Sequence, residues 1–188
     1  MDISKHETLW LQREGAKMIS NLGVKPDDCV VDFGSGHGRY TIPLSQVVGV
    51  KGHVYSFDSD QEVIEIQRAR LPVFSSLGIV TLHNVELFEL SKTIADQSVD
   101  SIFVFDVLQY VQDWDLLFSS FSRVLKPNGY IHIYPAAIPH PGSVDIELAN
   151  LKLKKFGFEQ LKATKYKMMH NVDMVEDVVY SFCLANLN

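Results

Sequence analysis

A short apolar run that ends in three closely spaced glycines constrains the fold of this chain most. Residues 28–33 (DCVVDF) are apolar on both parities, as in a parallel strand that helices cover on both faces. Gly34, Gly36 and Gly38 follow at once, and helix-forming sequence begins near Arg39. Glycines at this spacing let the backbone approach a ligand closely and direct N–H groups at it. The segment therefore predicts a buried strand, a ligand-binding loop and a helix, in that order.

Further apolar runs alternate along the chain with segments long enough for helices. This alternation is typical of an α/β fold with a mostly parallel sheet. The last two runs are separated by a turn-length segment, which favours an antiparallel hairpin at the sheet edge. The expected strands are 28–33, 53–57, 79–82, 101–105, 130–134, 158–167 and 178–185, and the expected helices include 4–22, 39–48 and 144–156.

Length and composition bound the remaining possibilities. The 188 residues hold no repeat and no Gly-, Ser- or Pro-rich linker, which predicts a single domain over residues 1–188. No apolar run approaches the roughly 18 residues that cross a bilayer, and the N-terminus has no apolar signal stretch. We therefore expect a cytoplasmic protein without a membrane partner. The formal net charge of −6 also argues against nucleic acid as a partner.

The cysteines and histidines predict neither a disulfide nor a metal site. Cys29 and Cys183 lie far apart, each within an apolar run, which is typical of reduced thiols in a core. The seven histidines are scattered, so no metal cofactor is expected. The lysines of residues 152–167 are interpreted as a solvated face whose charges discourage pairing at a sheet edge.

Two aspartates indicate the kind of ligand that the glycine loop binds. A dinucleotide fingerprint needs glycine where Arg39 stands, and Asp32 would repel a diphosphate, so a nicotinamide-dependent dehydrogenase is disfavoured. An amino-acid zwitterion suits both the loop N–H groups and Asp32. Asp58 ends the next apolar run, twenty positions beyond Gly38, where nucleotide-binding α/β folds place an acid for ribose hydroxyls. A zwitterion joined to a ribose describes S-adenosylmethionine.

Three segments of the sequence resemble the class I S-adenosylmethionine-dependent methyltransferases. They are the glycine motif DFGSGHG, the segment YSFDSD, and a block over residues 98–133 that contains RVLKPNG where the family usually has RVLKPGG. The resemblance runs through most of the chain. It implies a seven-stranded Rossmann-like sheet with helices on both faces, methyl transfer by in-line displacement (EC 2.1.1.-) and S-adenosylhomocysteine as product. The helix within residues 1–22 is expected to cover the cofactor and substrate side.

The resemblance also implies which residues bind the cofactor. Asp32 and the backbone of the glycine loop, Gly34, Ser35, Gly36 and Gly38, would hold the methionine portion, and Asp58 would hold the ribose. Ser59, Asn84 and Val85 would neighbour the adenine. The family usually has an acid where Asn84 stands, but the Asn84 amide oxygen can still accept a hydrogen bond from the adenine amine.

The end of the fourth expected strand is where the family brings the sulfonium and the acceptor together. Asp106 and Val107 stand there, and Asp106 would stabilise either group or, alternatively, cap the helical turn that follows. A general base is needed only if the acceptor must lose a proton. Tyr110 and Asp106 are the candidate catalytic residues, and His37 and His140 are weaker candidates.

The chain leaves little sequence for a lid, so we expect an open acceptor pocket. A small-molecule acceptor is expected, with a protein side chain as the alternative, and Trp10 stands either as a wall of the pocket or as core. The competing hypothesis for the whole protein is a non-catalytic module that binds S-adenosylmethionine as a sensor or as the partner subunit of another enzyme.

Overall fold

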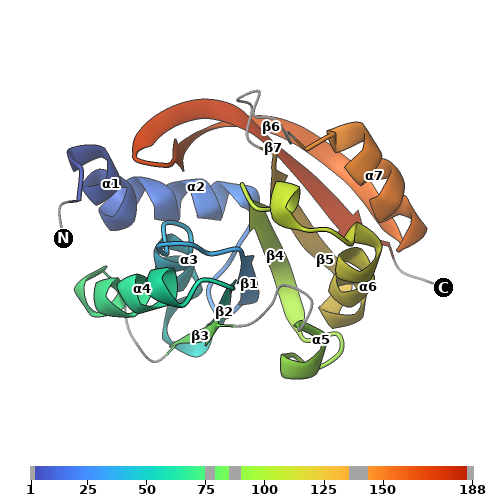
Figure 1. Ribbon diagram of the computed structural model, residues 1–188, viewed down its shortest axis with the longest axis horizontal. Coiled ribbons are helices and arrows are strands. Elements are labelled where there is room, and N and C mark those ends of the chain that lie inside the picture. The colour runs from blue at the N-terminus through green and yellow to red at the C-terminus, as the bar shows by residue number, and fades with distance from the viewer. Residues whose placement is uncertain (1–2, 75–78, 85–89, 136–143, 186–188) are drawn as a thin grey trace.

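A seven-stranded sheet forms the centre of the protein (Figure 1). The computed structural model describes residues 3–74, 79–84, 90–135 and 144–185. The strand order is β3-β2-β1-β4-β5-β7-β6, with β1 to β5 parallel and the last two strands antiparallel. The predicted Rossmann-like α/β fold is confirmed. The strands are β1 Cys29–Phe33, β2 His53–Asp58, β3 Val80–Asn84, β4 Val99–Phe105, β5 Leu125–Tyr134, β6 Phe158–His170 and β7 Asp173–Leu184.

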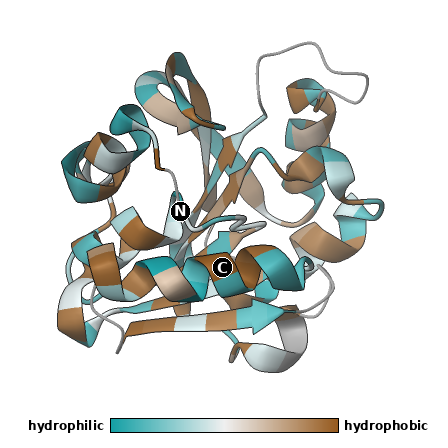
Figure 2. Cartoon of the chain, turned by 60° about the vertical axis from the view of Figure 1, so that its left-hand side comes forward, coloured by the Kyte–Doolittle hydropathy of each residue, from teal (hydrophilic) through white to brown (hydrophobic). Residues whose placement is uncertain are grey.

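Helices cover both faces of this sheet. One apolar core joins η1, α2, α3 and α4 to one face, and a second core joins α5, α6 and α7 to the other. Figure 2 shows the strands largely in brown and the helices banded in brown and teal. The helices are α1 Lys5–Leu9, α2 Gly15–Leu22, α3 Thr41–Val48, α4 Gln61–Phe74, α5 Leu90–Thr93, α6 Trp114–Val124 and α7 Ile146–Lys155, with the shorter turns η1 Trp10–Glu14, η2 Gly49–Lys51 and η4 Leu108–Tyr110.

Strand β1 contributes side chains to both cores. Val30 faces the core under the N-terminal helices, whereas Val31 and Phe33 face the core under α6 and α7. This arrangement follows from the two-residue period of a strand, because successive side chains point to opposite faces. Asp32 therefore shares the face of Val30, and the glycine loop leaves the strand at its carboxyl end.

The N-terminal helix is continuous from Lys5 to Leu22 but contains a π-helical turn, η1. Trp10 begins that turn and is fully buried, and its indole N–H donates to Arg39 O at 2.7 Å. Of the two interpretations of Trp10, the structure supports core. Gly23 ends the helix with a φ of 108°, as a C-terminal cap requires.

The C-terminal hairpin is longer than the sequence predicted. The first expected strand ends at residue 167 and the second begins at residue 178. In the structure β6 continues to His170 and β7 already begins at Asp173, with a two-residue turn between them. Met168 and Met169 are buried in the core under the N-terminal helices, which explains why the ladder continues. Figure 1 shows the hairpin curving from the sheet toward α1. At its tip, Ser4 Oγ donates to Val172 O at 3.3 Å.

Two further expectations concern membranes and thiols. Among the described residues, none of the helices combines the length and the apolar character that a membrane crossing requires. Cys29 and Cys183 are free and half-buried, and burial raises the pKa of Cys29 to about 11. A thiol with such a pKa is a poor nucleophile at neutral pH.

Candidate active site

The glycine loop between β1 and α3 has a backbone conformation that favours glycine. Gly34, Gly36 and Gly38 have φ values of 75°, 51° and 80°, in the left-handed region. A Cβ on Gly34 would lie 2.2 Å from Val107 Cγ2, so the loop also packs too closely on the end of β4 for a side chain there. The backbone N–H groups of Gly34 and Ser35 both donate to Phe57 O, which fixes the loop against β2.

Asp58 joins the end of β2 to this loop. Its Oδ2 accepts from Gly36 N at 2.7 Å, and its Oδ1 accepts from Asp60 N at 3.0 Å. Asn84 Nδ2 donates to Asp58 O at 3.4 Å. The structure thus brings together the predicted ribose and adenine residues, with Asn84 and the neighbouring Ser59 exposed. Val85 lies outside the described residues.

Asp32 lies beneath the loop rather than in an open cavity. Its side chain is buried, and its Oδ2 accepts from the Thr41 hydroxyl at 2.5 Å. Burial raises the pKa of Asp32 to about 7; the hydrogen bond from Thr41 lowers it and the charge of Asp58 raises it. The carboxylate therefore holds the start of α3 against β1.

A buried polar network continues from Asp32 to the loop. Gln67 of α4 is fully buried, and its amide nitrogen donates to Gly36 O at 3.0 Å and to Ser35 Oγ at 3.1 Å. Its amide oxygen lies 2.7 Å from Ser56 Oγ. Sequence reasoning missed Ser56 and Gln67, whose only signal was a polar residue within an apolar strand and within a helix.

Glu7 links the N-terminal helix to the same loop. Its carboxylate is almost fully buried, with Oε1 3.0 Å from Arg39 Nε and 2.9 Å from Arg70 Nη1. Arg70 Nη1 also donates to His37 O at 3.1 Å. Burial, and then the positive charges of Arg39 and Arg70, lower the pKa of His37. Sequence reasoning missed this cluster as well, because its members are distant in the chain.

A cavity of about 160 Å³ lies between the glycine loop, the end of β4 and the tip of the hairpin. Asp106 lies in its wall and has a φ of 56°. Gln109 Nε2 donates to Asp106 Oδ1 at 2.9 Å, and His170 Nδ1 lies 3.3 Å from Asp106 Oδ2. The residues that line the cavity are Gly34, Ser35, Gly36, His37, Arg39, Tyr40, Phe105, Asp106, Tyr134, Met169, His170 and Asn171.

The structure separates the two predicted catalytic residues. Asp106 lines the cavity, and the carboxylate that we considered as a helix cap accepts instead from the Gln109 side chain. Tyr110 is 74% exposed on η4 and is not among the residues that line the cavity. Its catalytic role stays a prediction, as does that of His140, which lies outside the described residues. Sequence reasoning missed His170, which the long hairpin brings to the cavity.

The tip of the C-terminal hairpin forms part of the wall of this cavity, and the expected open acceptor pocket stays a prediction. Met169, His170 and Asn171 line the cavity from the side opposite the glycine loop. Tyr40 fixes this wall, because its hydroxyl donates to Met169 O at 2.6 Å. The cavity is smaller than the roughly 300 Å³ typical of the smallest complete ligand sites. It therefore has room for only a part of a cofactor or an acceptor.

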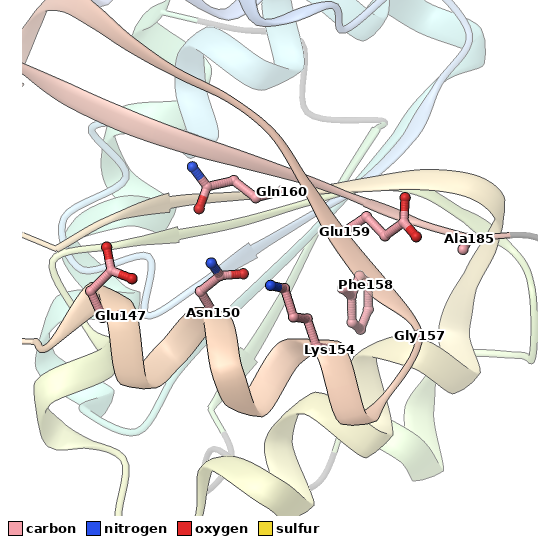
Figure 3. Close-up of a pocket in the computed structure, with 8 residues that line it drawn as sticks. All are labelled: Glu147, Asn150, Lys154, Gly157, Phe158, Glu159, Gln160 and Ala185. Atoms are coloured by element: carbon pink, nitrogen blue, oxygen red, sulfur yellow. The ribbon is translucent and has the colours of Figure 1, made fainter.

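A wider hollow of about 720 Å³ lies between α7 and β6 (Figure 3). The side chains of Glu147, Asn150 and Lys154 reach toward it from α7, and Gln160 reaches toward it from β6. None of the residues predicted to bind the cofactor lines it. Four of them, Gly34, Ser35, Gly36 and Asp106, line the smaller cavity instead.

The residues around the glycine loop fit S-adenosylmethionine. The loop has the close approach to β4 that excludes a Cβ at Gly34, and a half-buried carboxylate, Asp58, stands at the adjacent strand end. The exposed Asn84 amide lies next to that carboxylate. The acid and the amide are the groups that the sequence predicted for the ribose and adenine end of this cofactor, whereas the N–H groups of Gly34, Ser35, Gly36 and Gly38 already donate within the protein.

Comparisons with known proteins agree with this geometry. The model of the family described as "Methyltransferase domain" matches residues 31–133, more than half of the 188 residues. The ubiquinone/menaquinone biosynthesis C-methyltransferase UbiE of Vibrio cholerae serotype O1 is 31% identical over 121 residues, which are 64% of this chain and 46% of that protein. The ribosomal RNA small subunit methyltransferase H of Lactiplantibacillus plantarum is 30% identical over 98 residues, 52% of this chain and 30% of that protein.

This chain therefore spans less than half the length of these two curated relatives. Among solved structures, a SAM-dependent methyltransferase from Aquifex aeolicus has a TM-score of 0.74 and 22% identity, covering 94% of this chain and 92% of that one. This likeness shows the fold, and the family model covers the glycine motif and the RVLKPNG block. The chain belongs to the class I S-adenosylmethionine-dependent methyltransferases.

Proposed function

We propose that the protein transfers a methyl group from S-adenosylmethionine to a small-molecule acceptor. The hydrogen bond from Gly36 N to Asp58 Oδ2 carries this proposal, because it joins the loop proposed for the methionine to the acid proposed for the ribose. Family membership supports the use of this cofactor. When bound, S-adenosylmethionine supplies a methyl group on a positively charged sulfur.

The residues of this chain would act mainly by position. The loop from Gly34 to Gly38 would lie along the methionine portion, which its glycine backbone can approach closely, and Asp58 would accept from ribose hydroxyls. Asp32 lies behind the loop and accepts from Thr41, so it would position the loop rather than contact the ammonium group. Alignment of the acceptor with the methyl carbon and sulfur contributes several kcal/mol to such a displacement.

The cavity favours a small acceptor over a macromolecule. Its volume is about 160 Å³, and the apolar side chains in its wall are Tyr40, Phe105, Tyr134 and Met169. One relative is named for quinone biosynthesis and another for ribosomal RNA methylation. A partly enclosed aromatic wall and a formal net charge of −6 suit a ring compound better than an RNA.

Calorimetric titration with S-adenosylmethionine and S-adenosylhomocysteine tests the cofactor assignment. We expect binding of both by the wild type, and a loss of roughly 10-fold to 100-fold in affinity for Asp58→Ala, because hydrogen bonds to a charged group are lost. Glu62→Ala, which removes an exposed carboxylate in the first turn of α4, is the matched control and should bind as the wild type does. Equal affinity for both variants would overturn the ribose assignment.

Transfer itself is tested with methyl-tritiated S-adenosylmethionine and fractionated small molecules from a cell extract. We expect label in the small-molecule fraction and an equal release of S-adenosylhomocysteine. Label in protein or RNA would overturn the small-molecule assignment. Tight binding without any transfer would instead favour the non-catalytic module.

A further inference from the structure

His170 has the surroundings of a proton-accepting histidine. It is the last residue of β6, and its side chain is 9% exposed at the edge of the cavity. Its Nδ1 atom is buried, has no hydrogen-bond partner among the described residues, and lies 3.3 Å from Asp106 Oδ2. Its other ring nitrogen, Nε2, lies 3.1 Å from Asn171 Nδ2. The two ring nitrogens therefore face a carboxylate on one side and an amide nitrogen on the other.

These contacts select one tautomer of the neutral ring. The Asn171 amide nitrogen only donates hydrogen bonds, so Nε2 must accept and carry a lone pair. The ring proton then resides on Nδ1, which faces the acceptor-only carboxylate of Asp106. The Nδ1 atom and the carboxylate are close enough for a hydrogen bond but not aligned for one. Catalytic hydrogen bonds are often poorly aligned before substrate binds and tighten afterwards. A histidine oriented by a carboxylate at Nδ1 and unprotonated at Nε2 has the arrangement of a general base, once an acceptor hydroxyl replaces the Asn171 amide at Nε2.

Asp106 is itself held in place. Gln109 Nε2 donates both to its Oδ1 and to its backbone oxygen. Its backbone has a φ of 56°, a conformation that aspartate tolerates better than most residues and that directs the side chain from the end of β4. The carboxylate is therefore oriented before any ligand arrives.

Other polar groups face His170 from every neighbouring element. Tyr134 of β5 approaches the ring edge-on at 5.8 Å, and Asp173 of β7 stands opposite in the hairpin register. From the glycine loop, His37 and Arg39 line the same cavity. The charge of Arg39 is paired with Glu7. Asp106 is the carboxylate that lies 3.3 Å from the His170 ring.

We propose that His170 and Asp106 form a proton-accepting pair for the methyl acceptor, with Nε2 of His170 as the base and Asp106 as a positioning residue. The proposal rests on the proposed function. In the step, the acceptor oxygen forms a bond to the methyl carbon, the bond between that carbon and sulfur breaks, and its electron pair stays on sulfur. The acceptor proton passes to Nε2, which later releases it to water.

The pair also indicates the class of acceptor. A base is needed for a nucleophile that holds a proton at neutral pH, such as the hydroxyl of a phenol. The neighbouring aromatic rings of Tyr40, Phe105 and Tyr134 suit a small planar ring. The structure thus favours a ring hydroxyl over a thiol or a protonated amine.

The tautomer of His170 is the first test, and it needs no acceptor. Two-bond proton–nitrogen NMR spectra of the protein labelled with nitrogen-15 histidine, recorded on the free protein and with S-adenosylhomocysteine, should show the His170 proton on Nδ1 in both. In Asp106→Asn the side-chain amide can donate to Nδ1, so the proton should move to Nε2. The exposed His6 should keep its spectrum in both proteins. A wild-type His170 that carries its proton on Nε2 would overturn the pair.

The second test measures transfer to catechol and hydroquinone as probe acceptors. At pH 7 we expect His170→Gln to lower kcat at least 100-fold, a loss that shrinks as pH rises because the probe then ionises without a base. Affinity for S-adenosylmethionine, measured by calorimetry, should stay within threefold. His53→Gln, at the far end of β2, is the control and should keep the wild-type kcat.

Three outcomes have distinct meanings. A loss below threefold in His170→Gln would overturn the base, and turnover of a thiol or amine probe but neither ring hydroxyl would overturn the acceptor class. Absence of cofactor binding by the wild type would refute the proposed function instead, and the NMR result on the free protein would still decide whether the pair exists.

Discussion

Four of the residues that line the small cavity hold left-handed backbone conformations: Gly34, Gly36, Asp106 and Asn171. For Asp106 and Asn171 this conformation costs on the order of 1 kcal/mol each relative to an ordinary turn. Residues persist in such conformations where the surrounding contacts hold them, and they gather at functional sites. The backbone at this cavity is therefore shaped for close approach rather than for stability alone.

Alanine substitutions at two glycines distinguish the cost of backbone strain at positive φ from the cost of a steric clash with a neighbouring side chain. Gly34→Ala and Gly36→Ala both place a side chain at positive φ, but only the Cβ at Gly34 would meet Val107. We expect Gly36→Ala to lower the free energy of unfolding by about 1 kcal/mol, and Gly34→Ala by about 1 to 3 kcal/mol more. Urea titration measures both. Equal losses would show that Val107 moves aside without cost.

Asp32 makes stability depend on pH. Its pKa is about 7 in the folded protein and 3.8 in a model compound. Between these values the folded protein keeps a proton that the unfolded chain releases, so stability falls as pH rises from about 4 to 7. This group alone contributes a fall of roughly 4 kcal/mol, at 1.36 kcal/mol per pKa unit.

Asp32→Asn should remove that slope and gain stability at pH 8 relative to the wild type. Asp60→Asn, which changes an exposed carboxylate, is the control and should keep the slope. Urea unfolding at pH 4.5, 6 and 8 provides the comparison. The same change in stability between pH 4.5 and pH 8 in Asp32→Asn as in the wild type would contradict the elevated pKa.

At the scale of elements, local sequence was enough to predict strand β1, the glycine loop and several helix ends. β1 was predicted from an uninterrupted apolar run, and α7 begins after Asp145, whose carboxylate accepts from Glu147 N and Leu148 N. The length of the hairpin was not predicted, because burial of Met168 and Met169 depends on helices made much earlier in the chain. Asp106 was predicted as a site residue, but its partner His170 has no local signal.

The ion cluster that fixes the N-terminal helix was missed for the same reason. Glu7 and Arg70 are separated by 63 residues, and neither position is unusual for an exposed helix. Buried charges are stable only when paired, and the pairing exists only in the folded chain. Sequence reasoning therefore finds backbone motifs more readily than buried polar partners.

Removal of Glu7 should destabilise the protein and loosen the loop. Glu7→Ala deletes the carboxylate that both Arg39 and Arg70 contact, and we expect a loss of about 3 to 5 kcal/mol. Glu14→Ala breaks an exposed pair with the adjacent Arg13 and should cost under about 1 kcal/mol. Thermal unfolding compares the two. Similar losses would mean that water replaces the buried carboxylate.

At the scale of the whole molecule, the N-terminal helix and the C-terminal hairpin meet beside the glycine loop. Ser4 Oγ donates to Val172 O, and His6 Nδ1 lies 3.9 Å from Asp173 Oδ1. Tyr40, from the start of α3, lies edge-on to Trp10 and donates to Met169 O. Three distant parts of the chain thus share one small contact region around the cavity.

Hydrogen exchange should detect this shared region. With saturating S-adenosylhomocysteine, we expect amide exchange to slow at the glycine loop, at residues 168–173 and in α1, because a ligand on one wall stabilises the contacts of the others. Exchange in α7, beside the wider hollow, serves as the internal control and should not change. Slowing confined to residues 34–38 would show that the hairpin is independent of the cofactor.

The hairpin has a consequence for the order in which the site is made. A ribosome completes the glycine loop, Asp58 and Asp106 well before it reaches His170, and the strands that carry these earlier residues pair with one another in parallel. A nascent chain that stops after β5 would therefore lack Met169, His170 and Asn171, and with them the part of the cavity wall that the hairpin supplies. The site can be complete only once most of the chain has been synthesised.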